Sequence, residues 1–247
     1  MPCRKEKFEN GDIVHIILRS TEGIKIFKDA NDYFRMIFSI YEFNNTNPVL
    51  IRERRRTIDH FKKFSRGETF RGPTSVSFLN LDGNRDRMVD VFCFCFMPNH
   101  VHLLVRQIKD RGITEFIRKI GTGYGGYFNR KNKRKGHLFQ DVFKAIKIET
   151  NEQLMTVVSY IHTNPLSLRY SRWKEIRLDK PEEATKYLQD FKWSSHLDHI
   201  GIQNFPSVTQ RDFILELFGG AEKYKEFIFN YMSQKGESKE MFEIFLE

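Results

Sequence analysis

The chain has 247 residues, with 41 Lys and Arg against 32 Asp and Glu, so its formal net charge is +9 at pH 7. Hydrophobic residues make up 40% of the chain, which is enough to bury a core and excludes wholesale disorder. The longest purely apolar run, residues 91–97, is far shorter than the ~20 residues that a membrane helix needs. The excess of positive charge, together with 24 Phe, suits a protein that touches nucleic acid.

Cysteine use and the N-terminal sequence indicate the compartment. Two of the three cysteines are separated by one residue, so they do not form a disulfide framework. The N-terminus is charged from its fourth residue and has no apolar signal-peptide core. We therefore expect a cytoplasmic protein that has no membrane segment.

The first part of the chain predicts a strand, a helix and a basic region. Residues 13–18 are apolar and mostly β-branched, as in a buried strand. Residues 29–43 carry apolar side chains at helical spacing. Residues 51–72 hold eight Lys and Arg interleaved with Phe, and the pattern does not decide between a helix and a basic arm. By default such a run is a solvated face.

The middle of the chain predicts three strands and a helix. Residues 89–97 are apolar on both faces, as expected for a central strand that is covered on each side. A Pro-Asn pair ends this strand, and residues 100–106 form the next one. Residues 114–130 have helical spacing, and residues 142–148 suit another strand.

The last part of the chain is helical. Thr150 and Gln153 fit a capping box that begins an amphipathic helix, which Pro165 ends. After residue 170 the chain becomes polar and then offers short helices at about 209–218 and 221–232. This order of elements predicts an α+β fold with a mostly antiparallel sheet and helices packed on it.

Two pairs of side chains have a spacing that suits chemistry. His100 and His102 point to the same face of a strand and could supply half of a metal site. Tyr160 and Asn164 lie one turn apart on one ridge of a helix. Taken alone, each pair has a structural interpretation: incidental histidines, and a rim tyrosine with an asparagine that closes the helix before Pro165.

Together, the pairs resemble a family. The matching segments occur in family order, and they are VHIILRSTEGIKIFKDANDYF, CFMPNHVHLLV, YFNRKNKRKGHLFQDVFKA, YIHTNPL and FKWSSHLDHIG. The chain resembles the single-tyrosine HUH (IS200-like) transposases, and within them the REP-associated tyrosine transposases. The resemblance implies the HUH endonuclease fold, akin to a ferredoxin-like or RNA-recognition sheet. We expect a catalytic domain at residues 1–170, with a basic insertion at about 45–88, and a helical C-terminal extension at 171–247.

The resemblance also implies a reaction. His100, His102 and Asn164 would hold one Mg²⁺ or Mn²⁺ ion, and Tyr160 would attack the scissile phosphate of single-stranded or hairpin DNA. The products would be a 5′-phosphotyrosine and a free 3′-hydroxyl, which is later rejoined to another DNA end. A homodimer is one assembly that the resemblance allows. The resemblance also directs attention to residues that could contact DNA. These are Arg19, Tyr127, Arg130, Lys131, Lys133, Arg134 and Lys135.

Several other interpretations of these residues are open. The same family sheet would serve a catalytically silent, domesticated protein that binds hairpin or single-stranded nucleic acid. Cys93 and Cys95 could join the histidine pair in a zinc site, although their strand is strongly apolar. Residues 121–126 match a dinucleotide-binding glycine pattern but follow a helix, so close approach of the backbone to a neighbour, DNA being one candidate, suits them better.

Some nearby side chains are weaker candidates for a role in the site. Tyr124 and Tyr127 are rival nucleophiles, although neither has an amide one turn later that is followed by a helix stop. The remaining histidines show no spacing that is typical of metal ligands. Among them are His15, His60, His162, His196 and His199.

Overall fold

The computed structural model describes residues 7–49, 85–140, 142–170, 173 and 180–233. The basic run at 51–72 and most of the predicted insertion therefore lie outside the described residues. Four strands form one antiparallel sheet in the order β2-β3-β1-β4. The strands are β1 (Ile13–Arg19), β2 (Val89–Met97), β3 (His100–Gln107) and β4 (Lys144–Ile148). The α+β fold with an antiparallel sheet is thus confirmed.

The helices begin and end where local sequence signals occur. The Asp29 carboxylate accepts hydrogen bonds from the first backbone N–H groups of α1 (Ala30–Phe43), and the Thr150 hydroxyl does the same for α4 (Asn151–Thr163). Helix α3 spans Gly112–Lys131. The remaining elements are η1 (Thr21–Gly23), η3 (Asn164–Leu168), α5 (Pro181–Asp190), α6 (His196–His199), α7 (Asp212–Phe218) and α8 (Ala221–Ser233). None of the described helices combines the length and apolar character needed to cross a bilayer.

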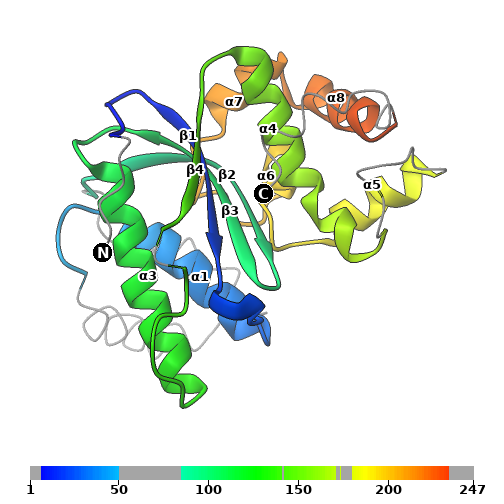
Figure 1. Cartoon of the computed structure of the whole chain (residues 1–247). Helices are drawn as coiled ribbons and strands as arrows, with labels where there is room; N and C mark the ends of the chain where they lie inside the picture. The colour runs from blue at the N-terminus through cyan, green and yellow to red at the C-terminus, as the bar shows by residue number, and fades with distance from the viewer. Residues whose placement is uncertain (1–6, 50–84, 141, 171–172, 174–179, 234–247) are drawn as a thin grey trace, which may run out of the picture.

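The sheet separates two apolar cores. Because side chains alternate along a strand, each strand supplies residues to both cores. Helices α1 and α3 cover one face, where Val101 and Leu103 of β3 are buried. Helix α4 and the C-terminal helices cover the other face, where Leu104 is buried (Figure 1). The C-terminal extension therefore shares a core with α4, while the domain boundary at residue 170 stays a prediction.

Strand β2 lies at the end of the sheet, so the expectation of a central strand was wrong. All nine of its residues are nevertheless buried. The C-terminal segment bonds to its outer edge: the N–H of Phe96 donates to the carbonyl of Trp193 at 2.9 Å, and the N–H of Ser195 donates to the carbonyl of Phe94 at 3.0 Å. Apolar residues on both faces of a strand therefore indicate that the strand is buried, and they do not show that it is central in the sheet. The edge of β2 is covered by residues about 100 positions away in the chain.

The glycines of α3 allow a close helix contact. A Cβ atom at Gly123 would overlap the ring of Phe43 at the end of α1. The predicted close approach of the backbone is therefore real at this position, and the neighbour is another helix of this chain. The dinucleotide-binding interpretation has no support, because these glycines lie within a helix.

Candidate functional site

The histidine pair lies on the sheet face that α4 covers. In the β1–β3 register, His100 is opposite Arg19 and His102 is opposite Ile17. The two imidazole rings are 4.8 Å apart and nearly perpendicular. His102 is buried, whereas His100 at the start of β3 is partly exposed. The pattern of alternate residues in the sequence is sufficient to place both rings on one face.

Helix α4 brings the tyrosine to the same place. The ring of Tyr160 lies 5.6 Å from that of His102 in an edge-on arrangement, and its side chain is only 3% exposed. Asn164 follows the last residue of α4, where Pro165 turns the chain into η3. Its side-chain Nδ2 is 3.2 Å from Nε2 of His102. The four predicted residues thus meet within one chain, while their chemical roles stay predictions.

A third histidine, His15 of β1, belongs to this cluster and was missed by the sequence analysis. Its Nε2 is 3.0 Å from Nδ1 of His102, and the two rings stack at 5.2 Å. The ring of Tyr160 lies 5.9 Å from it. Burial, together with the nearby charge of Lys144, lowers the pKa of His15 to about 3. The sequence does contain a signal for His15, because it is a polar residue inside an otherwise apolar strand. Its contact with His102 could not be predicted, because that contact depends on the order of the strands in the sheet.

The donor set suits a divalent ion. Rotation of the Asn164 amide by 180° places its oxygen beside Nε2 of His102, so that two donors of suitable type face each other. Nδ1 of His100 is 2.8 Å from the side-chain oxygen of Asn99. Because that oxygen only accepts, the neutral His100 ring donates from Nδ1 and carries its lone pair on Nε2. Imidazole nitrogen and amide oxygen are ligands that Mn²⁺ and Mg²⁺ accept.

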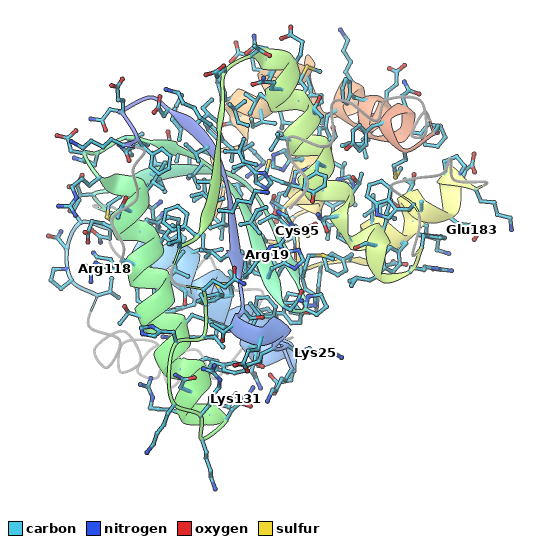
Figure 2. All side chains as sticks on the ribbon, in the orientation of Figure 1. Arg19, Lys25, Cys95, Arg118, Lys131 and Glu183 are labelled. Carbon is cyan, nitrogen blue, oxygen red and sulfur yellow. The ribbon has the colours of Figure 1, made fainter. Side chains whose placement is uncertain are left out.

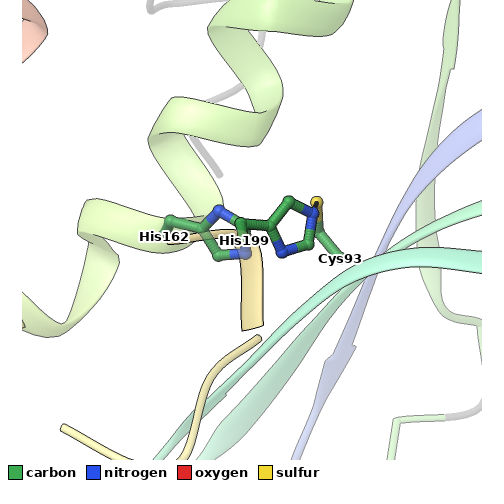
Figure 3. A group of neighbouring side chains, drawn as sticks. All are labelled: Cys93, His162 and His199. Carbon is green, nitrogen blue, oxygen red and sulfur yellow. Dashed lines mark hydrogen bonds between the residues drawn. The ribbon is translucent and has the colours of Figure 1, made fainter. Parts of the chain in front are cut away.

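A second group of possible ligands lies elsewhere. Cys93, His162 and His199 are buried, and their ligand atoms all lie within 4.8 Å of one another, so the group could hold a metal ion (Figure 3). Burial raises the pKa of the Cys93 thiol. Among the described residues, this is the candidate ligand group that includes a cysteine, and it contains neither Cys95 nor the histidine pair. The alternative of a zinc site formed by Cys93 and Cys95 with the histidine pair is therefore wrong.

Hydrogen bonds within the protein already engage the imidazoles of this second group. Nε2 of His162 is 2.7 Å from the hydroxyl of Ser195, and its Nδ1 is 2.7 Å from the hydroxyl of Tyr224. Nδ1 of His199 donates to the carbonyl of Ser195 at 2.9 Å. The group therefore also works as a polar connection between α4 and the C-terminal helices. His162 lies on another side of α4 from Tyr160, since it contacts Ser195 while Tyr160 contacts His102.

The rival tyrosines lie on the opposite face of the sheet. The hydroxyl of Tyr124 donates to the carbonyl of Ile26 at 2.6 Å, and burial raises its pKa. The hydroxyl of Tyr127 donates to the Asp32 carboxylate at 2.9 Å. Both rings therefore belong to the core that α1 and α3 form, away from the histidine pair.

The predicted DNA-contacting residues divide into two groups. Lys131, at the end of α3 in Figure 2, forms ion pairs with Asp29 and Asp32, and Arg134 donates to Asn129 and Thr21. Tyr127 is held by Asp32 and is only partly exposed. The second group is Arg130, Lys133 and Lys135, which are exposed; Lys131 is exposed too but differs from them by its ion pairs. Arg19 stands beside His100 in the strand register, at the candidate site itself.

Part of the chain is similar to a known family of proteins. Residues 82–164 match the family model described as "Transposase IS200 like". No curated protein matches the chain. A solved structure, described as "Structure of the REP associates tyrosine transposase bound to a REP hairpin", is similar with a TM-score of 0.45 and 12% identity, over 84% of this chain and 89% of that chain. The segment that holds the histidine pair, Tyr160 and Asn164 therefore matches the IS200-like transposase family model, in agreement with the resemblance.

Proposed function

We propose that the chain is a metal-dependent endonuclease and strand transferase that acts on single-stranded or hairpin DNA through a 5′-phosphotyrosine at Tyr160. The observation that carries the proposal is the meeting of Tyr160 and Asn164 with His102 in one chain, in the segment that matches the transposase family. Because one chain supplies all of these residues, a homodimer is not needed to complete the site.

His100, His102 and Asn164 would hold the ion, which is Mg²⁺ or Mn²⁺. When bound, the ion supplies Lewis-acid stabilisation of the negative charge on the scissile phosphate. Two imidazoles and one amide leave coordination positions open for phosphate oxygens. Such an open set suits an ion that works on a substrate, whereas a structural zinc site is closed by four protein ligands.

Tyr160 would be the nucleophile. Its hydroxyl oxygen forms a bond to phosphorus, the phenolic proton leaves to solvent, and the bond to the 3′ oxygen breaks. That oxygen takes up a proton and becomes a free 3′-hydroxyl. The phosphotyrosine keeps the energy of the phosphodiester, so attack by the 3′-hydroxyl of another DNA end rejoins the strand and releases Tyr160 without ATP.

The substrate must reach a side chain that is only 3% exposed. Entry of the phosphate therefore requires side chains around Tyr160 to move. The exposed cations at the end of α3, Arg130, Lys133 and Lys135, would bind the phosphate backbone of the DNA, and this binding weakens with salt. Arg19 stands close enough to His100 in the sheet to contact the scissile strand.

A covalent-adduct assay tests the proposal. Labelled single-stranded DNA from the flanks of the chain's own gene is mixed with protein in Mn²⁺ or in EDTA, and a denaturing gel shows whether label migrates with protein. We expect an adduct that needs Mn²⁺ and is absent in Tyr160→Phe. The matched control is Tyr124→Phe, which removes a buried hydroxyl on the other face of the sheet and should keep the adduct.

The same assay separates the two candidate activities. An adduct that persists in Tyr160→Phe would show that the nucleophile is another residue. A hairpin that forms no adduct, yet shifts on a native gel in a salt-sensitive way, would favour the domesticated, non-cleaving binder.

A further inference from the structure

We propose that His15 is a positioning residue for His102, which fixes the proton on Nδ1 of His102 and turns its Nε2 toward the ion. This inference rests on the proposed function, because it assigns a role beside the metal site described there. The observation that carries it is the 3.0 Å contact between Nε2 of His15 and Nδ1 of His102. The other ring nitrogen of His102, Nε2, lies 3.2 Å from Nδ2 of Asn164.

The proton arrangement follows from ligand chemistry. A neutral imidazole carries one proton, and the nitrogen that binds a metal must be the other one. Nε2 of His102 faces Asn164, so a bound ion requires the proton on Nδ1. An N–H group buried at this position needs an acceptor. Nε2 of His15 lies at hydrogen-bonding distance and can accept this hydrogen bond through its lone pair when the ring carries its proton on Nδ1.

The backbone fixes the contact in place. His15 and His102 lie on neighbouring strands, and their register is set by antiparallel pairing across the centre of the sheet. The two rings are stacked with an interplanar angle of 18°, and the ring of Tyr160 stands edge-on to both of them. His15 thus limits rotation of the His102 ring and also forms part of the surface against which Tyr160 rests.

Packing alone does not require a histidine at this position. The cross-strand neighbours of His15 are Leu104 and Ile146, and both are apolar. Its Nδ1 is buried and has no hydrogen-bond partner among the described residues. A polar atom buried without a partner costs stability, so an apolar side chain of similar size would suit the fold at least as well. The contact with His102 is what distinguishes a histidine from a leucine here.

Binding of Mn²⁺ alone, followed by the EPR signal of the free ion, tests this role in the full-length chain. We expect His15→Leu, which fills the space without an acceptor, to weaken Mn²⁺ binding by about 10–100-fold, the usual effect of losing such a partner of a ligand. His15→Gln can place a carbonyl oxygen near the position of Nε2 and should stay within about threefold of the unchanged protein. The melting temperature of His15→Leu should stay close to that of the unchanged protein, because removal of the unpaired Nδ1 of His15 offsets the acceptor that His102 loses.

The possible outcomes separate this inference from the proposed function. If the unchanged protein binds Mn²⁺ no more tightly than His102→Ala does, the metal site itself is wrong, and both proposals fail. If the unchanged protein binds Mn²⁺ and His15→Leu binds it equally well, only the role of His15 is wrong. Equal weakening by Leu and Gln, or a large loss of thermal stability in His15→Leu, would show that His15 acts through packing.

Discussion

The cations at the end of α3 differ in what holds them. Asp32 is completely buried, and it accepts hydrogen bonds from the hydroxyl of Tyr127, the Nζ of Lys131 and the backbone N–H of Lys28. Lys131 also pairs with Asp29, the residue that caps α1. Hydrogen bonds to these carboxylates raise the pKa of Lys131, so it stays charged. Lys131 therefore stabilises the α1–α3 contact, whereas exposed Lys133 is placed to contact a ligand.

A pair of substitutions separates these two roles. Lys131→Met leaves a buried carboxylate without its cation, so the free energy of unfolding in urea should fall by about 1–2 kcal/mol, less than for a fully buried pair because Lys131 is partly exposed. Lys133→Met should change the free energy of unfolding by less than about 0.5 kcal/mol. It should also reduce the slope of the logarithm of the hairpin-binding constant against the logarithm of the salt concentration, by the amount expected for the loss of about one phosphate contact. Unchanged stability in Lys131→Met would show that Asp32 does not depend on this ion pair.

At the residue scale, some of the site could be predicted and some could not. His100 and His102 follow from alternation within one strand, and Tyr160 and Asn164 follow from one turn of one helix. Both relations are local in sequence. The link from His102 to His15 crosses 87 positions, and it depends on β1 lying next to β3, which no local pattern states. The resemblance to a family, rather than spacing, predicted that the two pairs would meet.

At the scale of elements, the closest helix contact lies between α1 and α3. Gly123 faces the ring of Phe43, and a Cβ atom there would overlap it. Gly121, two residues earlier on the same helix, has nothing within 4 Å of the place where its Cβ atom would lie. A larger side chain would therefore clash at Gly123 but fit at Gly121, so the two glycines form a matched pair for substitution.

Alanine substitution at the two glycines should have effects of opposite sign. Gly123→Ala forces the helices apart and should lower the free energy of unfolding by about 1–3 kcal/mol. Gly121→Ala should raise it by up to about 1 kcal/mol, because alanine is the better helix former. Adding Phe43→Leu to Gly123→Ala should restore part of the loss, which thermal unfolding can measure. Equal effects of the two alanines would contradict the contact.

The elements themselves were largely readable from the sequence, but their order in the sheet was not. Apolar spacing predicted the strands at 13–18, 89–97 and 100–106 and the helices at 29–43 and 114–130, and each occurs within a few residues of its expected bounds. The strand predicted from residue 142 begins at Lys144. The position of β2 at the edge was missed because segment 193–195 hides that edge, and periodicity reports burial rather than the element that provides it.

At the scale of the whole molecule, α4 lies between the sheet and the C-terminal helices. A buried polar network joins these layers on the side of α4 away from Tyr160. The hydroxyl of Tyr224 in α8 contacts Nδ1 of both His162 and His196, donating to one and accepting from the other. The hydroxyl of Ser195 contacts His162 and also receives the backbone N–H of Phe94 in β2. The C-terminal helices thereby hold the tyrosine helix against the sheet.

This network predicts how stability depends on pH. Burial lowers the pKa of His196 to about 3 and that of His199 to about 4, and the facing groups include Tyr224, Cys93 and Arg211. Below the ordinary histidine pKa of ~6.5, the unfolded chain takes up protons that the folded chain does not. The free energy of unfolding should therefore be flat above pH 7 and fall as the pH drops from 6.5 to 4.

The size of the loss and its source can both be measured. Between pH 7.5 and pH 5, each of these histidines should cost up to about 2 kcal/mol of stability. His196→Asn keeps a polar atom near Nδ1 for Tyr224 but cannot titrate, so its unfolding free energy should depend less on pH by about that amount. Identical pH profiles for His196→Asn and the unchanged protein would mean that acid weakens the fold through groups other than His196.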